Sequence, residues 1–274
     1  MRRYRLGVCS WSLEAATADE LGERVAATGV RAVQLALDPI RLGYMELSQV
    51  RDRLREAGAE AVSGMMAMEG EDYSTLESIR ATGGIAPDAP WPRNRAAAVE
   101  LAKIAQELRL PLVTFHAGFI PHDAADPRRG ILIDRLRLLA SLYRDRRVQV
   151  GLETGQETAE TLEEILGALD GEGVGANVDP ANLILYGMGD PVAALHRLGP
   201  RVIQVHIKDA LPAVQEGQWG TEVPVGAGTV DWAAFLAALD RCPGVTTLVI
   251  EREAGAERVR DIVHARRFLE AALR

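Results

Sequence analysis

The chain has 274 residues, of which 47% are hydrophobic, so it can bury one large core and does not need a second domain. Its formal net charge is −8, and lysine and arginine form no dense cluster, which argues against nucleic acid or an anionic membrane surface as the main partner. We therefore expect a small-molecule ligand; a homo-oligomer is compatible with this composition.

The two cysteines lie in unlike contexts, Cys9 in an apolar run and Cys242 before a proline. This pattern favours reduced thiols over a disulfide framework. The apolar run Leu6–Ser10 is too short for the core of a signal peptide, and no stretch reaches the length of a membrane span. We expect a cytoplasmic protein.

Short apolar runs alternate with longer amphipathic segments from one end of the chain to the other, the pattern of repeated βα units. The expected strands are Leu6–Ser10, Ala32–Leu37, Glu60–Met65, Leu112–His116, Val148–Glu153, Val174–Asp179, Val202–Lys208 and Thr246–Glu251. The expected helices are Ala18–Thr28, Ser48–Ala57, Arg93–Leu108, Pro127–Asp145, Thr158–Leu169, Asp190–Leu198, Asp231–Leu239 and Ala256–Leu273.

Eight strands in strict alternation with eight helices predict a single (β/α)8 barrel, or TIM barrel, over residues 1–274. The first strand is not followed by Gly-x-Gly-x-x-Gly, so the dinucleotide-binding alternative lacks its sequence fingerprint. Two connections, Ala67–Pro92 and Asp209–Thr229, are longer than barrel loops require and are expected to rise from the catalytic face.

Four strands carry, at or near their C-terminal ends, a side chain that can bind a metal ion. These side chains are Glu153, Asp179, His206 and Glu251. Because a parallel barrel gathers the C-terminal ends of its strands around one mouth, we expect the four to converge. Three carboxylates and one imidazole suit a divalent cation such as Mn²⁺, Mg²⁺ or Co²⁺ better than a structural zinc ion.

The alternation of side chains along a strand extends this site. If His206 faces the barrel interior, Gln204 and Lys208 share its face, while Val205 and Ile207 point to the helices. A buried lysine needs a partner. We expect Lys208 to pair with Asp209 or with a substrate oxygen, and an exposed position at the loop edge is the alternative.

Gln204, Lys208 and further residues at the mouth are candidates for contact with the substrate. His116 ends the fourth expected strand, where it could contact substrate or cap the strand end. Glu157 and Asn182 follow two of the ligand candidates by a few residues. Trp219 lies in the connection after the seventh strand, where it could form an aromatic wall for a sugar ring or pack the loop.

The glycine-rich stretch Val225–Gly228 allows two interpretations. Backbone amides ahead of a helix can bind a phosphate, but glycines are also common turn residues, and Asp231 begins the next expected helix. The turn is the simpler interpretation.

Several segments resemble the sugar phosphate isomerase/epimerase family of xylose-isomerase-like TIM barrels. They are GLETG at 151–155, NVDPAN at 177–182, VHIKDA at 205–210, GAGTVDW at 226–232, VIERE at 249–253, and His116-Ala-Gly earlier in the chain. The resemblance implies one divalent cation, most often Mn²⁺ with Mg²⁺, Co²⁺ or Zn²⁺ as alternatives, held by Glu153, Asp179, His206 and Glu251. It also implies that Glu153 and Glu251 are the catalytic acid and base.

The expected activity is a metal-dependent sugar isomerase or epimerase that abstracts a proton beside a carbonyl through a metal-stabilised enediolate. Two positions depart from the ketose 3-epimerases of the family, which carry histidine and arginine where this chain has Asn182 and Pro212. A metal-dependent lyase or dehydratase acting on a keto-sugar or keto-glycoside is therefore kept as an alternative, and a non-catalytic sugar-binding barrel as a remote one. The acidic charge argues against DNA as substrate, and the strand ends supply too few histidines for the metal sites of the endonuclease IV relatives, so both features argue against that activity.

Overall fold

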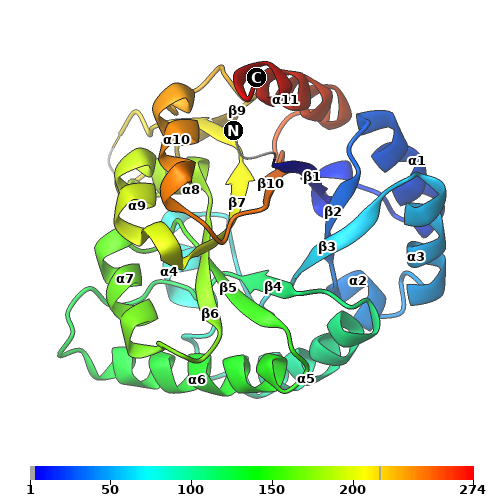
Figure 1. Cartoon of the computed structure of the whole chain (residues 1–274). Helices are drawn as coiled ribbons and strands as arrows, with labels where there is room; N and C mark the ends of the chain where they lie inside the picture. Colours follow the sequence, from blue (N-terminus) through cyan, green and yellow to red (C-terminus); the bar gives the residue numbers. More distant parts are fainter. Residues whose placement is uncertain (1–3, 216) are drawn as a thin grey trace.

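Eight parallel strands close into a barrel in a computed structural model that describes residues 4–215 and 217–274. Around the barrel the order is β1, β10, β7, β6, β5, β4, β3, β2, which confirms the expected (β/α)8 fold (Figure 1). The barrel strands are β1 (Arg5–Cys9), β2 (Ala32–Ala36), β3 (Glu60–Met65), β4 (Leu112–Phe115), β5 (Gln149–Glu153), β6 (Val174–Val178), β7 (Val202–Ile207) and β10 (Thr247–Ile250).

The helices lie around the outside of the strands (Figure 1). Those predicted from the sequence are α1 (Ala18–Thr28), α3 (Leu47–Glu56), α5 (Trp91–Glu107), α6 (Pro127–Arg144), α7 (Ala159–Ala168), α9 (Pro191–Leu198), α10 (Trp232–Ala238) and α11 (Arg258–Ala272). Side chains that satisfy free backbone amides fix several of their starts. Thr17 caps α1 by accepting from the amide of Glu20, and Asp190 caps α9 by accepting from the amide of Ala193.

The strands place apolar side chains against the helices and polar ones inside the barrel. Val205 and Ile207 of β7 are fully buried among other apolar residues, whereas Gln204 and His206, on the opposite face, contact polar groups across the barrel. This is the alternation expected from the sequence. The barrel interior near its C-terminal end is therefore a polar layer and not a purely apolar core.

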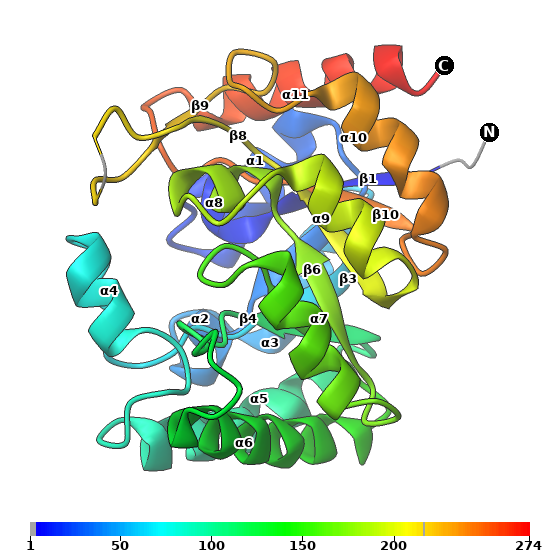
Figure 2. The same cartoon turned by 90° about the vertical axis from the view of Figure 1, so that its left-hand side faces the viewer.

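The two long connections contain secondary structure that the sequence patterns did not predict. The first, residues 67–92, contains α4 (Leu76–Thr82), whose Thr75 and Ser78 form a capping box. The second, residues 209–229, forms a hairpin of β8 (Asp209–Leu211) and β9 (Thr221–Val223); residue 216 within it lies outside the described part, as do residues 1–3. Figure 2 shows α4 and this hairpin on opposite sides of the same end of the barrel.

Shorter helices occupy other connections. They are α2 (Asp38–Arg41), α8 (Pro180–Leu185) and 3-10 turns at Ser10–Leu13, Gly199–Arg201 and Leu239–Arg241. Of these, α8 matters most for the site because it begins directly after β6, with Asp179 as its cap. Within residues 4–215 and 217–274, no helix has the length and apolar character needed to cross a membrane.

Two glycines hold the first long connection against the barrel mouth. Gly84 and Gly118 both have positive φ, at 66° and 91°. A Cβ atom on Gly84 would lie 2.2 Å from the backbone of Ala117, and one on Gly118 would lie 2.3 Å from the carbonyl oxygen of Gly83. Only glycine permits this approach, which brings residues 67–92 beside His116.

Candidate metal centre and substrate cavity

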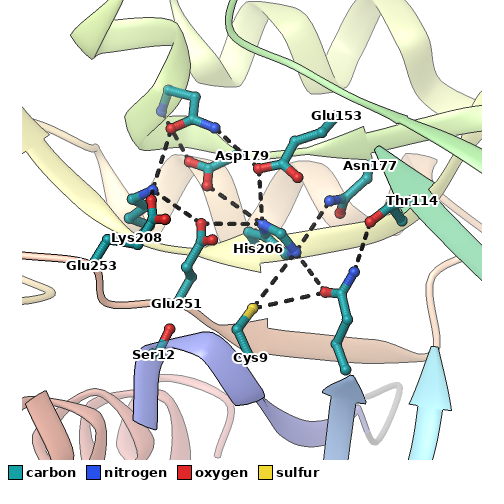
Figure 3. A network of polar contacts seen from close by, with 12 residues as sticks. Cys9, Ser12, Thr114, Glu153, Asn177, Asp179, His206, Lys208, Glu251 and Glu253 are labelled. Carbon is teal, nitrogen blue, oxygen red and sulfur yellow. Dashed lines mark hydrogen bonds and ion pairs between the residues drawn. The ribbon is translucent and has the colours of Figure 1, made fainter. Parts of the chain in front are cut away.

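Four side chains converge at the C-terminal end of the barrel (Figure 3). Glu153 ends β5, Asp179 follows β6, His206 lies in β7 and Glu251 follows β10. Nδ1 of His206 lies 3.3 Å from Oε1 of Glu153, 3.5 Å from Oδ2 of Asp179 and 3.3 Å from Oε2 of Glu251. All four side chains are buried, and their candidate ligand atoms lie within 4.8 Å of one another. The structure thus brings together the set singled out from the sequence.

The geometry of this cluster suits one divalent cation. Ligand atoms that share a cation at about 2.0–2.3 Å lie roughly 3.0–3.5 Å from their neighbours, which is the separation observed around His206. Oε2 of Glu153, Oδ2 of Asp179 and Nδ1 of His206 are buried without a hydrogen-bond partner among the described residues. Buried polar atoms are normally satisfied, so these three fit a site in which a cation completes their interactions.

The protonation states give the cluster a concentrated negative charge. Burial alone would raise the pKa of the carboxyl groups, but nearby positive charge outweighs it. The His116 and His206 imidazoles hold the pKa of Glu153 below its usual value, and Lys208 together with His206 does the same for Asp179 and Glu251. Three ionised carboxylates in a buried site create a strong attraction for a cation.

His206 responds to the same carboxylates. Burial favours its neutral form, but the negative charges of Glu153 and Glu251 raise the pKa of the imidazole well above the ordinary value. A cation bound at Nδ1 must replace the proton there, so metal binding should compete with protonation of His206.

Asp179 combines two tasks at the start of α8. Its Oδ1 accepts a hydrogen bond from the amide of Asn182 at 2.9 Å, which caps the helix, while Oδ2 faces His206. The Asn182 side chain donates from Nδ2 to Oε1 of Glu153 at 3.0 Å. The NVDPAN segment therefore fixes two of the candidate ligands at once.

Lys208 is buried, but its neighbour is not the one expected from the sequence. Its ammonium group contacts Oε2 of Glu251 at 3.1 Å and Oε2 of Glu253 at 2.5 Å (Figure 3). The expected pairing with Asp209 is wrong: Lys208 lies between β7 and β8, and the carboxylate of Asp209 turns away to accept hydrogen bonds from the amides of residues 226 and 228. Burial would lower the pKa of Lys208, yet the carboxylates of Glu251 and Glu253 raise it well above its ordinary value, so the group stays charged.

Asp209 instead organises the glycine-rich stretch. Its carboxylate accepts hydrogen bonds from the amides of Gly226 and Gly228 at 2.8 and 3.2 Å and from Nε1 of Trp232 at 2.9 Å. A carboxylate of the chain itself thus occupies the amides that a phosphate would need. The phosphate-cradle interpretation of residues 225–228 is wrong, and the turn leading to α10, capped by Asp231, is correct.

A cavity of about 490 Å³ opens beside the cluster. His116, Asn182, Lys208, Trp219 and Glu251 line it, so four of the six residues expected to contact substrate face the same space.

Gln204 and Glu157, the other two, do not line this cavity. Gln204 lies two residues before His206, one layer deeper in the barrel, where its amide donates to Gln34 at 2.9 Å. Glu157 lies beyond the end of β5 and is 2% exposed. The sequence-based expectation that these two residues contact substrate does not fit this cavity, because protein covers both side chains.

The cavity also has walls that the sequence patterns did not reveal. Glu71 and Tyr73 come from the first long connection, Tyr186 follows α8, and Glu253 follows β10. Tyr186 packs edge-on against Trp219 with ring centroids 4.8 Å apart. A second and larger hollow, of about 1040 Å³, lies among residues at the N-terminal ends of β1, β2 and β3, away from the cluster.

Gln34 of β2 is a further polar residue that sequence reasoning missed. It is completely buried, and its side-chain oxygen lies 2.7 Å from Nε2 of His206. The signal for it was a single polar residue in the otherwise apolar strand Ala32–Ala36, on the face that points into the barrel.

Known proteins with similar sequences or structures have the same TIM-barrel fold. The sequence profile of the family described as xylose isomerase-like TIM barrel matches residues 22–272. A crystal structure of a xylose isomerase domain protein from Planctomyces limnophilus has a TM-score of 0.86 and 27% sequence identity, covering 99% of this chain and 98% of that one. No curated protein matches the chain in sequence.

Two more distant structures share the fold. The probable 3-DHS dehydratase AsbF involved in petrobactin synthesis from Bacillus anthracis has a TM-score of 0.75 and 16% identity, with 97% and 98% of the two chains covered. D-psicose 3-epimerase with D-tagatose from Clostridium cellulolyticum H10 has a TM-score of 0.71 and 15% identity, with 98% and 99% covered. Because the family profile spans most of the sequence, this chain belongs to the xylose isomerase-like TIM barrel family.

Proposed function

We propose that the protein is a divalent-metal-dependent isomerase or epimerase that acts on a keto-sugar or sugar derivative by moving a proton on carbon next to a carbonyl. The observation that carries this proposal is the buried cluster of three carboxylates and one imidazole beside a cavity. Mn²⁺ is the first candidate, with Mg²⁺, Co²⁺ and Zn²⁺ as alternatives. Glu153 and Glu251 are the proposed acid and base as well as ligands.

The two glutamates are held by different partners. Oε1 of Glu251 accepts a hydrogen bond from Nε1 of Trp11 at 2.6 Å, and its Oε2 contacts Lys208. Glu153 is held at Oε1 by Asn182, whereas its Oε2 has no partner among the described residues. Glu251 lines the cavity, while Glu153 does not line it but contacts His116 and Asn182, which do. We expect each carboxylate to take or return a proton from its own strand end. A bound divalent cation would supply polarisation of the substrate's carbonyl and adjacent hydroxyl oxygens.

The charges around the cavity favour an unphosphorylated substrate. Among the described residues that line it, Lys208 is the single lysine or arginine, and two carboxylates already neutralise it. Arg41 and Arg252, outside the lining, are already paired with Asp38 and Glu222 in the walls, and Glu71 is a further carboxyl group there. A phosphate group normally requires arginine, lysine or free backbone amides, so we expect phosphorylated sugars to bind more weakly than the free sugars.

A lyase or dehydratase is the second candidate. Lys208 remains an ammonium group in the cavity wall, 3.1 Å from Glu251, where it could protonate a departing hydroxyl group. The similarity to the probable dehydratase from Bacillus anthracis lies in the fold. Both reactions begin with removal of the same kind of proton, so the products distinguish them.

The test is hydrogen exchange with solvent. Metal-loaded protein incubated in deuterated water with a panel of free and phosphorylated keto-sugars should incorporate deuterium beside the carbonyl of a free sugar. Glu153→Gln and Glu251→Gln should slow this exchange by about two to four orders of magnitude, because an amide cannot accept the proton. Mass spectrometry measures the exchange, elemental analysis measures the metal, and Glu107→Gln, at an exposed position, is the control.

The outcomes separate the candidates. Near-normal exchange in metal-replete variants would assign the proton transfers to other residues. A dehydrated or cleaved product would favour the lyase, and sugar binding without exchange or product would favour a non-catalytic barrel.

A further inference from the structure

The two nitrogens of His206 face chemically opposite surroundings. Nδ1 lies among the carboxylates of Glu153, Asp179 and Glu251 at 3.3–3.5 Å (Figure 3). Nε2 points back into the barrel, where the side-chain oxygen of Gln34 lies at 2.7 Å. The ring thus separates the candidate metal site from the polar layer beneath it.

The orientation of the Gln34 amide is set by a partner with fixed polarity. Its Nε2 donates to the backbone carbonyl oxygen of Gly64 at 3.3 Å, and a carbonyl oxygen can only accept. The same nitrogen lies 2.7 Å from Oγ1 of Thr114, while Nε2 of Gln204 donates to the Gln34 oxygen at 2.9 Å. Turning the amide over would place nitrogen against nitrogen at Gln204 and oxygen against oxygen at Gly64.

The Gln34 oxygen is therefore an acceptor aimed at His206, and Nε2 of His206 must be the nitrogen that carries hydrogen. Nδ1 is then the nitrogen left to bind a cation. Asn177 has its Nδ2 3.1 Å from Nε2, and its Oδ1 is buried without a partner among the described residues. Hydrogen on Nε2 therefore requires the Asn177 amide to be turned over, so the assignment rests on Gln34 and not on Asn177. Amide orientation is assigned from hydrogen bonding, and the turned amide would give Nε2 a second acceptor.

The barrel departs from regular pairing next to both of these residues. The register between β2 and β3 shifts between Val33 and Gln34, and that between β6 and β7 shifts between Ala176 and Asn177. Such irregularities re-aim side chains near functional sites. Here they lie beside the two amides that reach Nε2 of His206.

We propose that Gln34 is a positioning residue that fixes the His206 ring with hydrogen on Nε2 and presents Nδ1 to the divalent cation. The inference rests on the proposed metal site and goes beyond it by assigning a role to a residue of β2, which β10 and β1 separate from β7 around the barrel. Groups that orient a metal-binding histidine commonly change metal affinity 10- to 100-fold when they are removed. Gln34 touches neither substrate cavity nor carboxylates, so it acts through His206.

The first measurement uses the unmodified protein loaded with diamagnetic Zn²⁺. Nitrogen-15 spectra of the imidazole should show hydrogen on Nε2 and metal on Nδ1, with the His206 signals assigned by their loss in His206→Asn. The reverse arrangement, with hydrogen on Nδ1, would overturn the inference without any change to Gln34.

The second measurement compares variants by competition with a metal-binding dye. Gln34→Met removes the acceptor at nearly constant volume and should weaken Zn²⁺ and Mn²⁺ binding by about 10- to 100-fold. Gln34→Glu keeps an acceptor at Nε2, and at this fully buried position the carboxyl group should be protonated, so that its hydroxyl replaces the donor toward Gly64. This variant should retain most of the affinity and the Nε2–H signal. Thr28→Val is the control, since it removes a buried hydroxyl that donates to Val25 far from His206 and should lower stability alone.

Each result has a distinct meaning. Affinity within about threefold of the unmodified protein in folded Gln34→Met, with an unchanged ring signal, would overturn the role of Gln34 and leave the metal site intact. Failure of the unmodified protein to bind any divalent metal would overturn the metal site and this inference together.

Discussion

Glu157 is a buried carboxyl group whose surroundings disfavour its ionised form. It is 2% exposed, and its Oε1 has no hydrogen-bond partner among the described residues. Burial raises its pKa from 4.5 to about 8, and the charge of Glu153 adds to the effect. At neutral pH the group is therefore protonated in the folded protein and ionised in the unfolded chain.

This difference makes stability depend on pH with a definite sign. Between about pH 4.5 and 8 the folded state holds a proton that the unfolded state has released, so the free energy of unfolding falls as the pH rises. The free energy of unfolding falls by on the order of a few kcal/mol in total, and the fall ends near the pKa of Glu157 in the folded protein. Glu157→Gln should match the unmodified metal-free protein at pH 5 and exceed its stability at pH 8 to 9.

Thermal unfolding across this pH range measures the effect. The exposed substitution Glu107→Gln should leave the profile unchanged. Parallel profiles for Glu157→Gln and the unmodified protein would show that Glu157 is ionised in the fold or reaches solvent.

At the scale of elements, the loop between β9 and α10 depends on one carboxylate. Asp209 accepts from the amides of Ala210, Gly226, Gly228 and Val230 and from the Trp232 indole. A Cβ atom on Gly228 would lie 2.0 Å from Oδ1 of Asp209, so the loop closes tightly around this group.

Asp209→Asn should destabilise the protein by about 2–4 kcal/mol, because an amide nitrogen would face backbone donors and leave them unpaired. Asp231→Asn is the matched control in the same loop: Asp231 accepts one capping hydrogen bond from Ala234, and asparagine caps helices equally well. Urea unfolding should separate the two variants. Equal stability would mean that solvent or a rearranged loop satisfies the donors.

The strands and their end residues were predictable because β-branched runs repeat at barrel spacing, and a closed barrel leaves little freedom in where their ends point. This is why Glu153, Asp179, His206 and Glu251 could be assigned to one cluster. The expected pairing of Lys208 with Asp209 was wrong because it was based on their being neighbours in the sequence. Lys208 points into the barrel, whereas the carboxylate of Asp209 turns away from it toward the amides of residues 226 and 228.

The parts that could not be predicted depend on contacts between distant segments. Glu71 and Tyr73 reach the cavity because residues 67–92 fold back at Gly84 and Gly118, a contact without periodicity in the sequence. Gln34 was visible as a polar residue in an apolar strand, but its partner on β7 depends on two shifts of register.

At the scale of the whole molecule, a bound cation would tie four strands together. The candidate ligands come from β5, β6, β7 and β10, which are neighbours around the barrel. A ligand present at 100 times its dissociation constant for the folded state raises the free energy of unfolding by about 2.7 kcal/mol. Treatment with a chelator should therefore lower the melting temperature by about 5–10 °C.

Calorimetry with chelator, and then with added Mn²⁺, Mg²⁺, Co²⁺ or Zn²⁺, measures this coupling and ranks the metals. His206→Ala should melt at the same temperature with and without metal, since it lacks one candidate ligand. A melting temperature that no divalent ion changes in the unmodified protein would argue against the site.

The connection of residues 67–92 has a consequence for how such proteins diverge. All four candidate ligands follow it in the chain, while Glu71 and Tyr73 within it form part of the cavity wall. Insertions, deletions or recombination in this stretch can therefore alter what the cavity admits while the reactive centre is inherited unchanged. New substrate preferences in descendants of this chain should then arise first between β3 and α5.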